Sequence, residues 1–198
     1  MTDCIALLRG INVGRAKRIS MADLRGVFVD LGHENVRTVL NSGNVLFQCA
    51  RPSAARLALS IQAAITDSCG FSTSVTVLTA AKLASIVRAN PLQSVAKDSS
   101  RHFVAFVANP KSLAPLNALA AKARAPDILA IGADAAYLWC AGGALDSTLF
   151  QAFARHAGGS VTARNWATVL KVLAASQTLG LDVGCRRLVV SRPRTVRP

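Results

Sequence analysis

The first 78 residues show one order of elements that few folds accommodate: strand, helix, strand, strand, helix, strand. Each apolar segment repeats at a spacing typical of its element, with a period of two in strands and Leu24, Val27, Phe28 and Leu31 at helical spacing. The predicted elements are a strand at 3–8, a helix capped by Ser20 and stopped at Gly32, strands at 36–40 and 45–47, a helix from Pro52 to about Ser68, and a strand at 71–78. This order predicts a ferredoxin-like unit.

A topological consequence follows from this order. A right-handed crossover makes the first two strands parallel, so their carboxyl ends lie at the same edge of the sheet. The first strand ends at Arg9–Gly14 and the second at the hairpin loop Asn41–Asn44. We therefore expect these two polar loops to meet.

The same order of elements recurs after residue 100, without recognisable similarity between the repeated residues. The predicted elements are a helix from Thr79 to about Asn90, a linker at 93–100, a strand at 102–107, a helix from Pro110 to Ala123, strands at 128–131 and 135–139, a helix from Asp146 to His156, a short strand at 161–163, and a helix from Asn165 to Ser176. The prediction is an α+β protein of two ferredoxin-like (βαββαβ) halves with mainly antiparallel sheets. We place the first half at 1–78, a connecting helix and linker at 79–100, the second half at 101–178, and a fraying, arginine-rich tail at 179–198.

Composition excludes several classes of protein. Half of the 198 residues are hydrophobic, yet no apolar run approaches the roughly 20 residues of a membrane span, and the N-terminus does not resemble a signal peptide. The five cysteines and three histidines are scattered without metal-ligand spacing, so we expect free thiols, no metal site and no cofactor. These observations favour a cytoplasmic protein. The net charge of +13 favours anionic partners but is also found in proteins that are merely basic.

The candidate site consists of the two loops, joined by a strand-to-helix junction in the second half. Its residues are Arg9, Asn12, Asn41, Ser42 and Asn44, with Arg164 and Asn165 as additional members. Glycines and backbone N–H groups of the first loop could cradle an anion, with Arg9 supplying a charged fork. The alternative is structural: Asn12 and the glycines form a turn that bonds to the hairpin, Asn165 caps a helix, Trp166 fills the core and Arg164 is a surface charge.

Two functions follow from these residues. The first is binding of an anionic ligand, either a phosphate-bearing metabolite or nucleic acid, at the edge formed by Arg9–Gly14 and Asn41–Asn44. One Tyr, two Trp and seven Phe, with no basic and aromatic string, disfavour sequence-specific RNA binding. The alternative is a small-molecule enzyme that orients its substrate with Asn and Arg side chains. No set of catalytic residues is evident. The sequence does not decide whether the protein is an enzyme, nor what its oligomeric state is.

Three motifs resemble a bacterial family called domain of unknown function 1697. They are Ile5–Gly14, then Met21-x-x-Leu24 followed by Val36-Arg37-Thr38 and Asn41–Val45, and finally Thr162–Lys171. The resemblance covers roughly residues 3–175 and implies a two-part α+β protein, with no established activity to carry over. This chain departs from the family at Leu145–Leu149, where Thr148 stands in place of an expected Lys.

Overall fold

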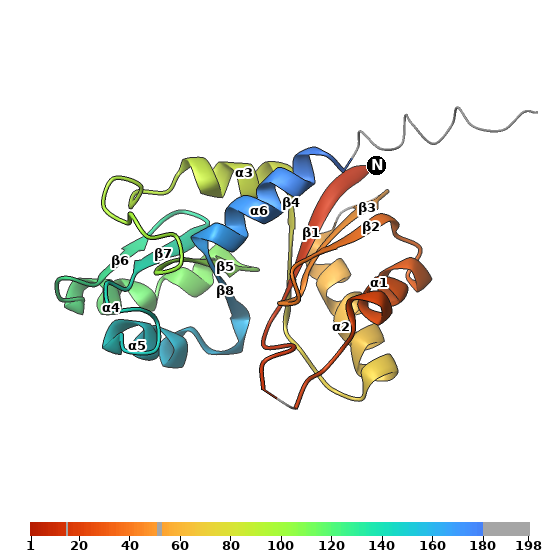
Figure 1. Cartoon of the computed structure of the whole chain (residues 1–198), viewed down its shortest axis with the longest axis horizontal. Coiled ribbons are helices and arrows are strands. Elements are labelled where there is room, and N and C mark those ends of the chain that lie inside the picture. The colour runs from red at the N-terminus through yellow and green to blue at the C-terminus, as the bar shows by residue number, and fades with distance from the viewer. Residues whose placement is uncertain (15, 51–52, 180–198) are drawn as a thin grey trace, which may run out of the picture.

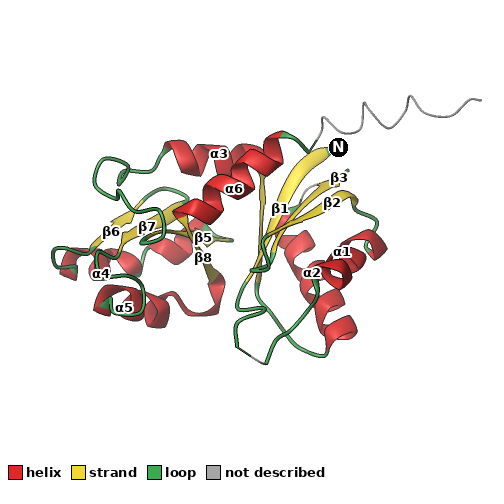
Figure 2. Ribbon diagram, in the orientation of Figure 1, coloured by secondary structure: helices red, strands yellow, loops and turns green. Residues whose placement is uncertain are grey.

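The protein contains two four-stranded sheets, each covered by its own helices (Figures 1 and 2). The structure is a computed structural model, and it describes residues 1–14, 16–50 and 53–179. The predicted start of a helix at Pro52 and the predicted tail from 180 onward therefore lie outside the described residues. The mixed α+β architecture with two antiparallel sheets confirms the predicted fold class.

The first sheet has the strand order β2-β3-β1-β4, and every neighbouring pair is antiparallel. Since β1 and β2 both run antiparallel to β3, they point in the same direction, as the crossover rule predicts. Helices α1 and α2 cover one face of this sheet (Figure 1). The elements are β1 (Thr2–Leu8), α1 (Met21–Asp30), β2 (Glu34–Val39), β3 (Asn44–Cys49), α2 (Ala54–Cys69) and β4 (Val75–Thr79).

Strand β1 lies at the centre of the molecule because both of its faces are buried. Cys4, Ala6 and Leu8 pack against α1 and α2, while Ile5 and Leu7 face the second half. All five are at most 2% exposed. A continuous apolar run is the pattern expected of a strand buried on both sides.

The second sheet has the strand order β6-β7-β5-β8 and is also antiparallel throughout. Helices α4 and α5 cover its outer face, where they form a separate core with β5 and β7. The elements are β5 (His102–Val107), α4 (Leu116–Lys122), β6 (Ile128–Ile131), β7 (Ala135–Trp139), α5 (Thr148–Ala157) and β8 (Val161–Asn165).

A central core joins the two sheets through helices α3 (Ala80–Arg88) and α6 (Trp166–Gln177), which pack on each other. In Figure 1 these helices lie across the space between the sheets. The two sheets approach directly at Thr76 and Thr162, whose hydroxyl oxygens lie 3.2 Å apart. A second contact joins β7 to α3: the Tyr137 hydroxyl donates to the Ile86 carbonyl at 2.7 Å. Burial raises the pKa of Tyr137 to about 12, so it remains a donor at neutral pH.

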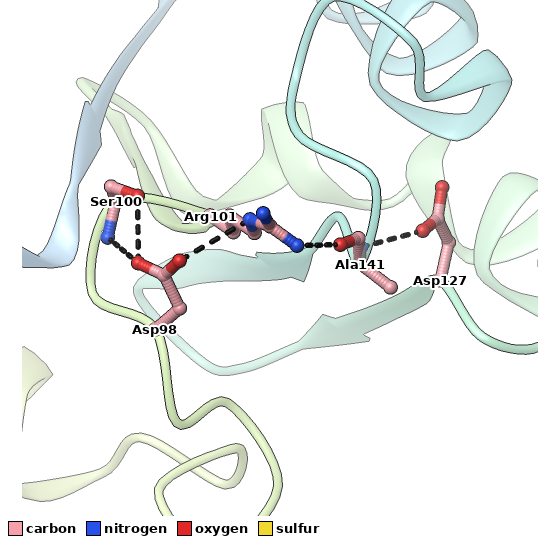
Figure 3. A network of polar contacts seen from close by, with 5 residues as sticks. All are labelled: Asp98, Ser100, Arg101, Asp127 and Ala141. Carbon is pink, nitrogen blue, oxygen red and sulfur yellow. Dashed lines mark hydrogen bonds and ion pairs between the residues drawn. The ribbon is translucent and has the colours of Figure 1, made fainter.

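The segment between α3 and β5 is fastened by a chain of polar contacts (Figure 3). The Asp98 carboxylate accepts hydrogen bonds from Ser100 and lies 3.2 Å from the Arg101 guanidinium, which in turn donates to the Ala141 carbonyl at 2.5 Å. The Ala141 N–H then donates to Asp127 at 2.9 Å. The predicted linker at 93–100 is therefore an ordered connection held against the second half.

Two predicted elements differ from those observed. The strand predicted at 71–78 begins only at Val75. Ahead of it the Arg9 N–H donates to the Ser74 carbonyl at 2.9 Å, and the Arg9 carbonyl then accepts from the Thr73 hydroxyl at 2.7 Å, so a side-chain bond stands where the next backbone bond of a ladder would be. The helix predicted from Pro110 to Ala123 is divided into a 3-10 turn at Pro110–Leu113 and α4, because Pro115 has no N–H to continue a helical ladder.

Candidate functional site

The two predicted loops meet at one end of the first sheet, as the topology requires. The Leu8 N–H donates to the Gly43 carbonyl at 2.8 Å, so the β2–β3 hairpin touches the end of β1. Gly43 packs tightly there: a Cβ atom at this position would lie 2.8 Å from Ile11 Cδ1 and 2.9 Å from Leu8 Cβ. Its φ of +78° also favours glycine. The meeting of the loops was predicted from topology alone, and it is confirmed.

Asn12 fastens its own loop to the hairpin. Its side chain bonds both backbone groups of Ile19 at 3.0 Å, and its amide nitrogen also donates to the Asn41 carbonyl at 3.0 Å. The Asn12 backbone has a left-handed φ of +56°, a conformation that Asn tolerates better than most residues. These contacts are those of the structural alternative, in which Asn12 forms a turn that bonds to the hairpin.

Arg164 and Asn44 connect the second half to this edge. Asn44 is fully buried, its amide nitrogen donates to the Val39 carbonyl and the Ser42 hydroxyl, and its Oδ1 accepts from Arg164 Nε at 2.6 Å. Arg164 also donates to the carbonyls of Leu8, Ser42 and Gly43 at 2.6, 2.8 and 3.3 Å. Arg164 is therefore a bridge between the halves, and the surface charge suggested for it is wrong.

Arg164 is a half-buried cation held by neutral oxygens. Burial lowers its pKa to about 10, which still leaves it charged at neutral pH. Among the described residues no carboxylate forms an ion pair with it. Its hydrogen bonds to carbonyl and amide oxygens offset the desolvation of the guanidinium.

Of the remaining predicted residues, Arg9 and Asn165 form hydrogen bonds within the protein, and Asn41 and Ser42 are exposed to solvent. The Arg9 guanidinium donates to the Gly158 carbonyl in the second half. Asn165 caps α6, with its side chain accepting from the Thr168 N–H at 2.9 Å, and Trp166 packs into the central core.

Beside the joined loops lies an open cavity of about 890 Å³. It is bounded by the β1–α1 loop, one side of α1 and the carboxyl end of α2. Asn12 and Asn41 line it, so both predicted loops contribute. The other lining residues are Arg18, Ile19, Ser20, Met21, Asp23, Gly26, Val27, Asp30, Ser68 and Cys69.

Arg18 and Asp30 are two of the lining residues that sequence reasoning missed. Both are exposed, and neither side chain forms a hydrogen bond or ion pair with another described residue. Asp23, in contrast, accepts a hydrogen bond from the Ser20 hydroxyl at 2.7 Å. A signal for Arg18 was present: residues 9–18 contain Arg9, Arg15, Lys17 and Arg18 with no acidic residue, directly before the Ser20 cap.

The part of the chain that the structure describes contains no group of three or more His, Cys, Asp or Glu side chains arranged to hold a metal ion. Within the same residues, no helix combines the length and the apolar character that crossing a membrane requires.

Comparisons with known proteins agree with the fold. The model of a family described as "Protein of unknown function (DUF1697)" matches residues 1–137. A conserved bacterial protein from Streptococcus pneumoniae, SP0830, has a similar structure with a TM-score of 0.72. The match covers 89% of this chain and 99% of the pneumococcal chain at 24% identity, so it supports the fold alone. No curated protein matches the chain.

Proposed function

The chain belongs to the DUF1697 family of proteins of unknown function, and from its site we propose that it binds a small anionic metabolite in the cavity beside the Arg9–Gly14 and Asn41–Asn44 loops. The observation that carries the proposal is Arg18: an arginine without a partner among the described residues, at a cavity of about 890 Å³ that both loops line. A guanidinium is suited to carboxylate or phosphate oxygens because its donors form a planar fork. Asn41 adds an exposed amide on the opposite loop.

The charges of the lining favour a small molecule over nucleic acid. Asp23 and Asp30 line the same cavity as Arg18, so a continuous polyanion would be repelled along part of its path. A metabolite that carries one anionic group and several hydroxyl or amino groups fits this arrangement. Its anionic group would bind Arg18, and its donors would bind Asp30 and the Asn41 amide oxygen.

The internal bonds of the loops argue against the alternative enzyme. That hypothesis assigned substrate orientation to Asn and Arg side chains, yet the polar atoms of Asn12, Asn44 and Arg164 bond protein groups. We propose that these three residues shape the site, while Arg18, Asp30 and Asn41 contact the ligand.

The test is a thermal-shift screen of sugar phosphates, nucleotides and carboxylated metabolites at moderate salt. A ligand at 100 times its Kd adds about 2.7 kcal/mol to the free energy of unfolding. We expect Arg18→Ala to abolish the shift and Arg56→Ala to preserve it. The two variants lose the same charge, but Arg56 lies at the start of α2, whereas the cavity lies at its end.

Cys69 provides a direct readout at the cavity. Cys69 lines the cavity and is half-buried, whereas Cys4, Cys49 and Cys140 are buried. In a Cys185→Ser background, a bound ligand should slow alkylation of Cys69 about tenfold at ten times its Kd, because only the free protein reacts. Equal shifts in both arginine variants, or binding restricted to nucleic acid at low salt, would reject the proposal.

A further inference from the structure

Cys4 and Cys49 form a close pair of thiols at the other end of the first sheet. They lie on the neighbouring antiparallel strands β1 and β3, where Cys4 is opposite Phe47 and Cys49 is opposite Thr2. The thiols are therefore diagonal neighbours on the same face, 45 residues apart in sequence. Their sulfur atoms are 3.4 Å apart, and the residues are 1% and 6% exposed.

We propose that this pair is an oxidation site, at which hydrogen peroxide converts the two thiols into an intramolecular disulfide. Sulfur atoms at 3.4 Å need to approach by only about 1.4 Å to reach the length of a disulfide bond. The strands already hold the two thiols together, so no folding step is needed to bring them into contact. Cys140, the other buried thiol among the described residues, lies in a different core, packed under α4 and α5.

The chemistry balances with peroxide as the oxidant. The thiolate of one cysteine attacks a peroxide oxygen and breaks the O–O bond, which gives a sulfenic acid and, after protonation, one water molecule. The second thiol attacks the sulfenic sulfur, the S–S bond forms, and the sulfenic oxygen leaves as the second water molecule. Two electrons pass from the sulfur atoms to the peroxide, and both thiol protons end in water.

The environment makes this oxidation slow and selective for small oxidants. Burial, together with the hydrogen bond to Cys49, raises the pKa of Cys4 to about 12, so the reactive thiolate is scarce at neutral pH. Access is best from the end of the sheet, where Met1 and Ala50 are exposed. Local opening of these strand ends would admit peroxide to the pair.

The test uses the full chain with Cys69→Ser and Cys185→Ser, which leaves three thiols. After peroxide treatment and removal of the oxidant, the remaining thiols are alkylated in denaturant and the protein is digested with trypsin. We expect the count of thiols to fall from three to one. The peptide containing residues 1–9 should appear linked to the peptide containing residues 38–56, and a dithiol reductant should release both.

Two controls make the outcome decisive. Cys49→Ser in the same background should leave no linked peptide, whereas Cys140→Ser should leave the link intact. Recovery of Cys4 and Cys49 as alkylated thiols, or as separate sulfinic acids, would overturn the proposal. Because this pair and the cavity lie at opposite ends of β1, neither result depends on ligand binding.

Discussion

At the scale of single residues, Arg164 shows how a charged side chain can serve the fold. Its Nε and one terminal nitrogen bond Asn44, Leu8 and Ser42, which belong to the other half of the chain. These oxygens lie at strand ends and in a hairpin, where they have no place in a regular ladder. The guanidinium therefore completes the hydrogen bonding of an irregular backbone.

We predict that Arg164→Ala lowers the free energy of unfolding by about 3 kcal/mol, because hydrogen bonds to a charged group contribute about 1.5–3 kcal/mol and the substitution leaves buried oxygens unsatisfied. Urea unfolding at neutral pH measures the change. The matched control is Arg18→Ala, which removes an exposed arginine and should change stability by less than about 0.5 kcal/mol. Equal effects of the two substitutions would contradict the bridging role of Arg164.

At the scale of elements, the β2–β3 hairpin is fixed as much by its neighbours as by its own turn. Gly43 contacts Leu8 and Ile11, and the Leu8 N–H donates to its carbonyl. The site therefore depends on close approach between the hairpin and the end of β1.

We predict that Gly43→Ala costs about 3 kcal/mol of unfolding free energy, because a left-handed φ costs an alanine about 1–2 kcal/mol and the clash with Ile11 adds an overpacking cost of similar size. Gly10→Ala is the control: its φ is +67°, but nothing lies within 4 Å of an added Cβ. It should cost only the backbone part, about 1–2 kcal/mol. Chemical denaturation distinguishes the two, and indistinguishable losses would show that packing at Gly43 does not matter.

The elements themselves could be predicted from the sequence because their signals are local. The Ser20 cap and the apolar run of β1 each depend on neighbouring residues, whereas the alternation at 71–78 placed the start of β4 four residues too early. The meeting of the loops followed from topology. The partners of Arg164 in the first half could not be predicted, because they lie more than 100 residues away and, apart from the Asn44 side-chain oxygen, are backbone carbonyls. The position of Arg18 at a cavity was missed because a cavity depends on how α1 and α2 pack.

At the scale of the whole molecule, the two halves share one core. Residues of both sheets pack with α3 and α6 in it, and Tyr137 on β7 bonds a carbonyl at the end of α3. Carbonyls at the carboxyl end of a helix lack intrahelical partners, so the tyrosine satisfies one that would otherwise be buried alone. A shared core predicts that neither half unfolds without the other.

Both tryptophans, Trp139 and Trp166, pack in the shared core, whereas far-ultraviolet circular dichroism reports all helices and strands. We predict that the two signals follow one urea transition, as two-state unfolding requires. Tyr137→Phe should move both transitions together by about 1–2 kcal/mol, the cost of an unsatisfied buried acceptor. Lys82→Ala, which breaks the partly exposed ion pair with Asp134 across the same interface, should cost less than about 1 kcal/mol. A fluorescence transition that separates from the circular dichroism transition, in the native sequence or in Tyr137→Phe, would mean that the halves are independent units in contact.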